Sequence, residues 1–214
     1  MIITKQKGID EIFSALRGAK SVFIVGCGDC AALCRTGGRS EIEKMTEILK
    51  SHDVLVTGSA LPHSTCHELD VQRILRANKE AVEKSDAILV LACGAGTQAV
   101  GDSIKKPAVS GCDSLFIGNS KRQMHFYEKC SVCGDCVLNE TGGLCPETRC
   151  PKGMQNGPCG GAVRGNCEVD HARPCVWIEI YDRLKEFGRL DDLKKLVKPK
   201  NRKVATKPHR IEKE

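Results

Sequence analysis

Cysteine is the residue type whose number and spacing in this chain best predict chemistry. Eight of the 14 cysteines fall within positions 130–175 of the 214-residue sequence. The first three form a CxxCxxC run, and the fourth precedes a proline. The remaining four follow at steps of nine, eight and eight positions. The two sets are Cys130, Cys133, Cys136 and Cys145, and then Cys150, Cys159, Cys167 and Cys175.

Residues 130–175 need a covalent or metal staple, because large apolar residues are sparse there while Gly and Pro recur. Disulfides, zinc and iron-sulfur clusters are the alternatives. The N-terminus shows no signal-peptide pattern, which predicts a cytoplasmic chain, where structural disulfides are rare. Zinc sites commonly use two separated CxxC pairs. A CxxCxxC run with a last cysteine before proline is typical of bacterial ferredoxins, although eight residues precede that cysteine here in place of three. We therefore predict two [4Fe-4S] clusters in this segment, with zinc as the alternative in one site.

The first 124 residues alternate apolar strands with amphipathic helices. This alternation predicts an α/β fold, a flavodoxin-like open parallel sheet with helices on both faces. Ser40 and Glu43 predict a capping box at the start of one helix. The expected strands are 21–26, 53–58, 86–93 and 113–118, and the expected helices are 8–17, 40–50, 66–84 and 95–103.

Five more cysteines lie at or after the ends of these strands, where parallel sheets form their sites. They are Cys27, Cys30, Cys34, Cys66 and Cys93. We expect four of the five to bind a third [4Fe-4S] cluster at the sheet edge, although spacing does not say which four. One alternative is that they are small core residues, as we expect for Cys112. Another is a zinc site of Cys66 with His63 and His67.

Two glycine-rich stretches could instead bind a nucleotide or phosphate. Gly26 and Gly28 begin a GxGxxG pattern, but Ala31 stands where the third glycine is needed, which argues against a dinucleotide loop. Residues 93–100 (CGAGTQAV) could cradle a phosphate at a helix N-terminus, or place N–H groups against cluster sulfides.

The chain ends in an amphipathic helix and a basic tail. The apolar face predicts a helix that is packed inside the protein or against another subunit; it consists of Trp177, Ile180, Tyr181, Leu184 and Phe187. From Lys194 to Glu214 there are nine Lys or Arg and two Glu, which accounts for the whole net charge of +6. We expect a solvated tail, or one that docks on an acidic partner. No aromatic platform accompanies it, so we expect no nucleic-acid binding.

These patterns favour electron transfer over bond-making chemistry. The sequence contains no Walker loop, no Ser/His/Asp arrangement in a recognisable context, and no apolar run long enough to span a membrane. We expect three domains: an α/β domain over 1–124, a cysteine-rich module with a closing helix over 125–190, and the tail over 191–214. The alternatives are a zinc-stapled scaffold without a redox role, and a stand-alone flavodoxin-like protein that binds a corrinoid or nucleotide.

Several motifs together resemble a known family. They are CSVCGDCVLNETGGLCPETRC (130–150), NGPCGG (156–161) and the closing CxWxxIYxRLK (175–185), with VGCGDCAALCRTGG (25–38), Cys66 and LACGAG (91–96) upstream. In these motifs the chain is similar, over about residues 1–190, to the MetV-type small subunit of methylenetetrahydrofolate reductase. This module is also described as a methylenetetrahydrofolate reductase C-terminal domain.

The resemblance implies a non-catalytic subunit of an oxidoreductase and a partner. That partner is a MetF-type, flavin-bearing (β/α)8 subunit that binds the folate, and further subunits supply electrons. Such complexes reduce methylenetetrahydrofolate to methyltetrahydrofolate in the reductive acetyl-CoA pathway of anaerobes. By the same resemblance, the eight cysteines of 130–175 are cluster or zinc ligands, and the five upstream cysteines form the N-terminal set.

Overall fold

The structure, a computed structural model, describes residues 1–196 and 198–211. The chain divides into two compact units. Unit 1 consists of Met1–Phe116 and Ser120–Phe126, and unit 2 consists of Ile117–Asn119 and Tyr127–Glu214. Each unit is described separately below.

Unit 1 is built around a parallel four-stranded sheet in the order β3-β2-β4-β5. Counted along the chain, this order is 2-1-3-4, as in doubly wound sheets. The two central strands are buried along their whole length because helices cover both faces. The strands are β2 (Ser21–Val25), β3 (Leu55–Ala60), β4 (Ala87–Val90) and β5 (Ala108–Ser110). The prediction of an α/β fold with a parallel sheet is confirmed.

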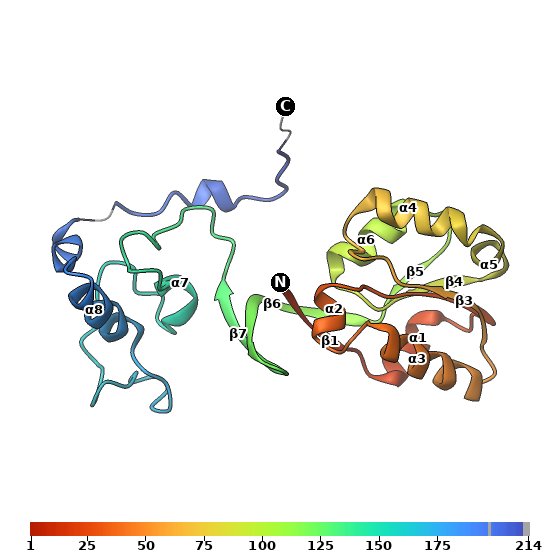
Figure 1. The fold of residues 1–214 in the computed structure, drawn as a ribbon, viewed down its shortest axis with the longest axis horizontal. Helices are drawn as coiled ribbons and strands as arrows, with labels where there is room; N and C mark the ends of the chain where they lie inside the picture. Colours follow the sequence, from red (N-terminus) through yellow and green to blue (C-terminus); the bar gives the residue numbers. More distant parts are fainter. Residues whose placement is uncertain (197, 212–214) are drawn as a thin grey trace. The chain divides into compact units, whose positions relative to one another are not determined.

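The helices of unit 1 cover the two faces of this sheet in two groups (Figure 1). Residues of α1 and α3 form one core cluster with the sheet, and residues of α4, α5 and α6 form the other. A single turn, α2 (Cys30–Leu33), follows β2. The remaining helices are α1 (Ile9–Leu16), α3 (Arg39–Ser51), α4 (Glu68–Ala77), α5 (Lys79–Lys84) and α6 (Gly94–Asp102).

Three local predictions in unit 1 were wrong. The helix expected over 66–84 is broken at Asn78, whose side chain donates to the Ile74 carbonyl at 2.8 Å and so competes with the helical backbone. The capping box at Ser40 and Glu43 does not form, because α3 begins earlier and the Gly38 N–H donates to the Glu41 carboxylate at 2.9 Å. The strand expected from 53 begins later because Asp53 has a left-handed φ of 59°.

A second sheet has the order β1-β6-β7. Its strands are β1 (Ile2–Gln6), β6 (Cys112–Arg122) and β7 (His125–Cys130). Residues 113–118, which we had expected to extend the parallel sheet, therefore belong to β6 instead. Gln123 and Met124 alone connect β6 to β7, and Met124 has a left-handed φ of 65° that fits a tight turn.

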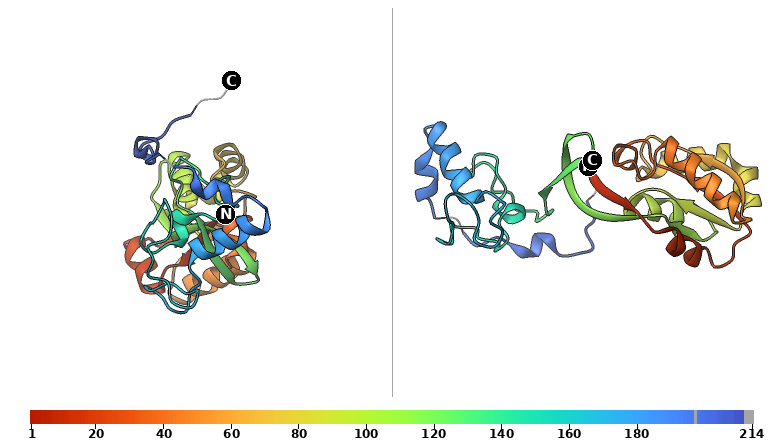
Figure 2. Two further views of the ribbon diagram at one scale, coloured as in Figure 1. Left: turned by 90° about the vertical axis from the view of Figure 1, so that its left-hand side faces the viewer. Right: turned by 90° about the horizontal axis from the view of Figure 1, so that it is seen from below.

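Unit 2 consists mostly of loops around two short helices, α7 (Pro146–Arg149) and α8 (Val176–Glu186) (Figure 2). Two 3-10 turns follow, η1 (Leu190–Lys194) and η2 (Arg202–Ala205). The core of this unit is one small cluster of Leu144, Val176, Trp177, Ile180 and Leu184. The apolar face of α8 is narrower than predicted, since Tyr181 and Phe187 are 46% and 53% exposed. Among the described residues, no helix is long and apolar enough to cross a bilayer.

Candidate functional site

All 14 cysteines lie in the described part of the chain, and all are free thiols. The disulfide alternative therefore does not hold in this structure. Within residues 1–196 and 198–211, no three His, Cys, Asp or Glu side chains are already grouped as a metal-ion site. The question is then which of the predicted ligands lie near one another.

The four cysteines of the second set line one small cavity of about 20 Å³. Cys150 directly follows α7, and Cys175 directly precedes α8. Cys159 and Cys167 come from the long loop between these helices. Backbone bonds close this loop on itself, since the Cys167 N–H donates to Arg173 and the Cys175 N–H to Gly165, each at 2.9 Å. The fold of unit 2 thus places around one cavity four cysteines that are spread over 25 positions of the sequence, from Cys150 to Cys175.

Charged and aromatic side chains line the same cavity. The Cys159 thiol donates to the Glu168 carboxylate at 3.2 Å, and Lys152 pairs with the same carboxylate. The contact with Glu168 raises the pKa of Lys152, and the charges of Cys159 and Cys167 act in the same direction. Trp177, only 7% exposed, lines the cavity and donates its indole N–H to the Met154 carbonyl at 3.0 Å. The thiols therefore have a cation and an aromatic ring beside them, and Cys159 is exposed.

The first set lies on a tightly turned loop between β7 and α7. Cys130 ends β7, and Cys145 is the N-cap of α7. Between the first three cysteines, Val132 and Gly134 take left-handed φ values of 56° and 76°, so the chain reverses at each CxxC step. The Val132 N–H donates to the Cys130 sulfur at 3.3 Å. Amide-to-sulfur bonds of this kind are among the features that tune cluster ligands.

A lysine from the basic tail reaches the first set. The Lys200 ammonium lies 3.1 Å from the Cys133 sulfur, and its charge also interacts with Cys145. The hydrogen bond from Lys200 is the main reason why the pKa of Cys133 lies below its usual value. A lowered thiol pKa favours the thiolate, which is the form that binds metals. Lys200 therefore links two cysteines of the first set electrostatically.

The structure buries most of the N-terminal set, wholly or in part, and leaves one member exposed. Cys27, Cys34 and Cys93 are buried, and Cys30 is partly buried and close enough to Cys27 for their charges to interact. Burial also raises the pKa of Cys30. Cys66 is exposed, with its sulfur 3.3 Å from the Ser64 hydroxyl.

Cys112, expected as a core residue, does belong to the core cluster, and burial raises its pKa to about 12. It nevertheless lies near two members of the N-terminal set, because the charges of Cys34 and Cys93 interact with it. Its thiol donates to the Thr36 carbonyl at 3.5 Å. Sequence spacing did not suggest this neighbourhood, because Cys112 follows β5 and not one of the strands that precede the other cysteines.

The alternative sites of unit 1 receive little support. His63 and His67 are exposed, and the His67 ring lies 3.4 Å from the Asp70 carboxylate of its own helix. The described residues hold no grouped triad that would join either histidine to Cys66. At the N-terminus of α6, the Gly94 N–H donates to the Ser114 hydroxyl at 2.9 Å, so it is not free for a phosphate.

The glycines after β2 serve close packing of the backbone. A Cβ at Gly37 would lie 1.8 Å from the Leu91 carbonyl oxygen, and one at Gly26 would lie 2.4 Å from the Gly37 oxygen. Ala31, at the position of the missing glycine, is buried among core residues. This packing explains the glycines without a nucleotide.

The comparison with known families matches the second half of the chain. Residues 109–203 match the family described as methylene-tetrahydrofolate reductase C terminal. No curated protein and no solved structure matches the chain. The matched segment contains both C-terminal sets of cysteines and Lys200, and it reaches further into the basic tail than the motifs of the sequence suggested. The match supports a relation to methylenetetrahydrofolate reductase.

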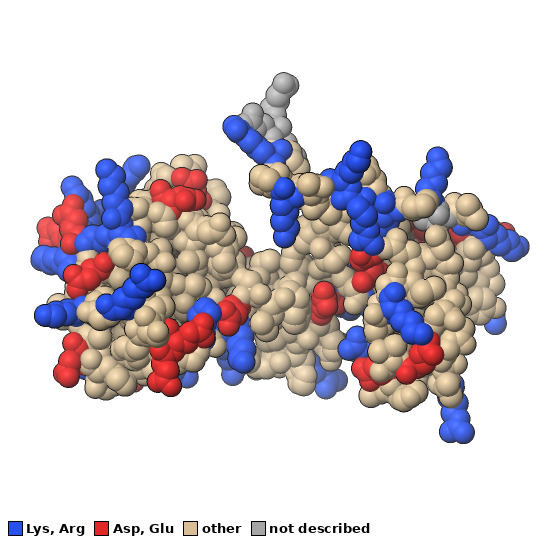
Figure 3. Space-filling view, turned by 180° about the vertical axis from the view of Figure 1, so that it is seen from behind, with Lys and Arg blue, Asp and Glu red and all other residues tan. Residues whose placement is uncertain are grey.

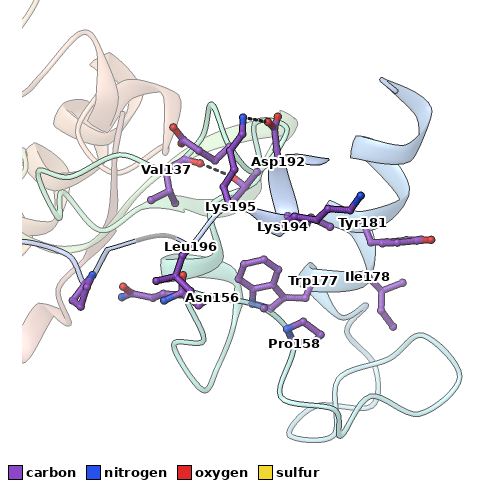
Figure 4. Close-up of a pocket in the computed structure, with 16 residues that line it drawn as sticks. Val137, Asn156, Pro158, Trp177, Ile178, Tyr181, Asp192, Lys194, Lys195 and Leu196 are labelled. Carbon is purple, nitrogen blue, oxygen red and sulfur yellow. Dashed lines mark hydrogen bonds and ion pairs between the residues drawn. The ribbon is translucent and has the colours of Figure 1, made fainter. Parts of the chain in front are cut away.

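The reductase-related segment also lines a wider pocket, with a volume of about 740 Å³. Trp177, Ile178 and Tyr181 of α8 form one wall, and Leu196 and Asn156 contribute to the other (Figure 4). Lys195 and Asp192 on its rim pair with each other at 2.6 Å. Trp177 lines both this pocket and the thiol cavity.

Sequence reasoning missed three charged residues of the reductase-related segment. Lys152 and Glu168 stand in loops without periodicity, so only the fold shows that they meet beside Cys159. Lys200 lies in a tail that its composition marks as solvated. The one available signal for Lys200 was the continuation of the family match to residue 203.

Proposed function

We propose that this chain is the MetV-type, iron-sulfur electron-transfer subunit of a methylenetetrahydrofolate reductase complex. It passes electrons to the flavin of a MetF-type partner that binds the folate, and further subunits supply those electrons. One observation carries the proposal: four thiols of the segment that matches the reductase C-terminal family line a single cavity. The match by itself would fit any role in such a complex. The convergence of the thiols is what favours a metal centre.

The donors present fit an iron-sulfur or zinc centre. Thiolates are soft ligands that these metals prefer over hard oxygen donors. Cys150, Cys159, Cys167 and Cys175 would hold one centre, and Cys130, Cys133, Cys136 and Cys145 another. The N-terminal set would supply a third. When bound, a [4Fe-4S] cluster accepts and donates single electrons.

The side chains around the thiols have roles that follow from their contacts. Trp177 lines one side of the second set, which favours a lower local dielectric on that side of any bound charge. Lys152 offsets part of the negative charge of Cys159 and Cys167, and Glu168 holds Lys152 in place. These residues position and stabilise the ligands, and none of them forms or breaks a bond.

A second candidate function is a zinc-stapled scaffold without a redox role. The size of the cavity favours it, because about 20 Å³ is enough for one water-sized particle and far less than a cubane cluster occupies. A single zinc ion with four cysteine ligands needs little more room than that. In this case the chain would hold the catalytic subunit in the assembly and carry no electrons.

Metal analysis of the anaerobically purified chain separates the two functions. The electron-transfer function predicts about eight to twelve iron atoms and as many sulfide ions per chain, because each of two to three clusters holds four of each. It also predicts bleaching by dithionite. Zinc alone, with no bleaching, would reject electron transfer and support the scaffold.

A matched pair of variants then assigns the second set. Cys159→Ser should remove about four irons, the content of one cluster. Cys112→Ala, a buried cysteine outside the predicted ligands, should keep the full metal content. The same samples, reduced with dithionite and freed of its excess, should reduce the flavin of an added reductase subunit only when the clusters are present to carry the electrons.

A further inference from the structure

The basic tail of unit 2 is in contact with the loop of the first cysteine set. The Arg202 guanidinium pairs with the Glu147 carboxylate at 2.8 Å, directly after the Cys145–Pro146 step. The Asn201 N–H donates to the Asp135 carboxylate at 3.3 Å. This stretch of the tail is exposed, as expected, but it is held against the loop by these contacts.

The contact also has an apolar part and a preformed turn. Val204 packs against Gly134, where an added Cβ would lie 2.9 Å from a Val204 methyl carbon. Gly134 stands between Cys133 and Cys136, so the tail lies directly on the backbone of the CxxC step. The Asn201 side chain accepts from the Lys203 N–H at 3.1 Å and begins η2, which fixes the direction of the tail there. The contacts therefore lie at Cys133–Asp135 and just after Cys145, at Glu147.

We propose that residues 200–204 form a strap that clamps the first cysteine set, with Lys200 as the positioning residue that donates to the Cys133 sulfur and promotes retention of metal there. The clamp itself stands on the contacts above. The effect on metal retention rests on the proposed function.

The charge of the strap suits this role. Four thiolates around one metal site carry a large negative charge, and a nearby ammonium group reduces their mutual repulsion. Lys and Arg side chains follow the segment that leads to the C-terminus, whereas charges of both signs are mixed elsewhere on the visible face (Figure 3). Of these basic residues, Lys200 is the one in contact with a cysteine sulfur in the described chain. Lys198 is exposed, with no contact of its side chain shown among the described residues.

Hydrogen exchange on the full chain, purified with its bound metal, tests the clamp. Amides of residues 200–206 should exchange more slowly in the wild type than in Arg202→Met, by about fivefold or more, because the ion pair and the backbone bond hold the strap. Lys198→Met should keep the wild-type protection. The double variant Glu147→Arg with Arg202→Glu should restore part of it. Equal exchange in the wild type and Arg202→Met would overturn the strap, whatever metal the protein binds.

Site-resolved metal release tests Lys200. The full chain is loaded with Zn²⁺ as the probe, a chelator is added, and alkylation of the Cys133 peptide is followed by mass spectrometry, with the Cys159 peptide as internal reference. Lys200→Met should speed the loss of protection at Cys133 by about tenfold or more, and leave Cys159 unchanged. Lys200→Arg should restore slow release, because it keeps a cationic donor.

Equal release rates for Lys200→Met and Lys198→Met would overturn the role of Lys200. A chain that protects neither peptide in the wild type would count against the proposed function and against metal retention by Lys200, while the exchange result on the strap would still stand.

Discussion

The two units of this chain are held together in different ways. Unit 1 has a parallel sheet with a large apolar cluster on each face, and its central strands are fully buried. Unit 2 has a single cluster of five buried residues for the whole of its loop-rich structure. Burial of apolar area is the main favourable term in folding. It is therefore sufficient for unit 1 and too small for unit 2.

The backbone of unit 2 makes its stability harder still to explain by packing. Eight of the nine glycines with positive φ lie in this unit, and Gly18 is the exception in unit 1. Glycine loses more conformational freedom on folding than any other residue, so these turns carry a high entropy cost. The cysteines are the groups in unit 2 that could offset that cost by binding metal. The difference between the units thus points to metal as a folding partner of unit 2.

Removal of metal should have the largest effect, and it should affect the two units differently. We expect a chelator under reducing conditions to unfold unit 2 and to leave unit 1 folded, because metal-binding energy is folding energy when no site exists in the unfolded chain. Hydrogen exchange resolved by peptide would report the two units separately. If unit 2 kept its protection after complete metal removal, its five-residue cluster would be sufficient and our reading of the difference would be wrong.

The same type of substitution, Phe to Ala, made once in each unit should have unequal effects on stability. Phe23 is fully buried in the sheet of unit 1, whereas Phe187 is 53% exposed at the end of α8. Phe23→Ala should lower the free energy of unfolding of unit 1 by about 3–5 kcal/mol and leave the metal of unit 2 in place. Phe187→Ala should change stability by less than about 0.5 kcal/mol. Denaturant unfolding, with alkylation of the Cys159 peptide as the readout of metal in unit 2, would check both. A loss of metal from unit 2 in Phe23→Ala would show that the units are not independent.

The same difference explains how much the sequence could predict. The strands at Ser21–Val25 and Ala87–Val90 are continuous apolar runs, so their burial on both faces was predictable. The break at Asn78 and the late start of β3 at Leu55 depend on one side-chain bond and one left-handed residue, which periodicity does not reveal. The apolar run within residues 113–118 predicts a strand, but it does not say which sheet the strand joins. That depends on pairing with β1 and β7, which are distant or irregular in the sequence pattern.

In unit 2, spacing predicted which cysteines share a cavity, but not where the tail lies. The grouping of Cys150 with Cys175 followed from counting cysteines, and the two do line one cavity. The docked tail did not follow, because a lysine-rich segment has the composition of a solvated one until a specific acceptor such as Glu147 is placed beside it. Only the three-dimensional arrangement supplies that acceptor.

Trp177 offers a smaller test of how packing supports the thiol cavity. Its indole N–H donates to the Met154 carbonyl at 3.0 Å, so Trp177→Phe removes one buried hydrogen bond while it keeps an aromatic ring. We expect a loss of about 0.5–1.5 kcal/mol in the stability of unit 2, measured by denaturant unfolding in the presence of metal. Tyr181→Phe, which alters a half-exposed ring on the same helix, is the control and should be near neutral. A larger loss of stability in Tyr181→Phe than in Trp177→Phe would contradict this role of Trp177, because Tyr181 lines only the wider pocket.

The smallest effect that we predict is the loss, in acid, of the stability that the Asp86 carboxylate contributes to unit 1. Three hydrogen bonds at 2.9 Å, from the backbone N–H groups of Lys20 and Ser21 and from the Ser21 hydroxyl, hold the Asp86 carboxylate, and the bonds from Ser21 are the main reason that its pKa lies below the ordinary value of 3.8. A lowered folded-state pKa means that this stabilisation is complete above that ordinary value and is lost as the pH falls through the folded pKa. Asp86→Asn should therefore unfold at a slightly lower temperature than the wild type at pH 7, and the difference should shrink as the carboxylate is protonated.

The control is Asp102→Asn, which alters an exposed carboxylate for which the described residues show no side-chain hydrogen bond. Its unfolding temperature should match that of the wild type both at pH 7 and in acid. Under the proposed function, unit 2 is held by metal-bound thiolates, which acid also protonates. Its own acid loss should therefore begin at higher pH than that of unit 1, and a reversed order would contradict the proposal of a packed unit and a metal-dependent one.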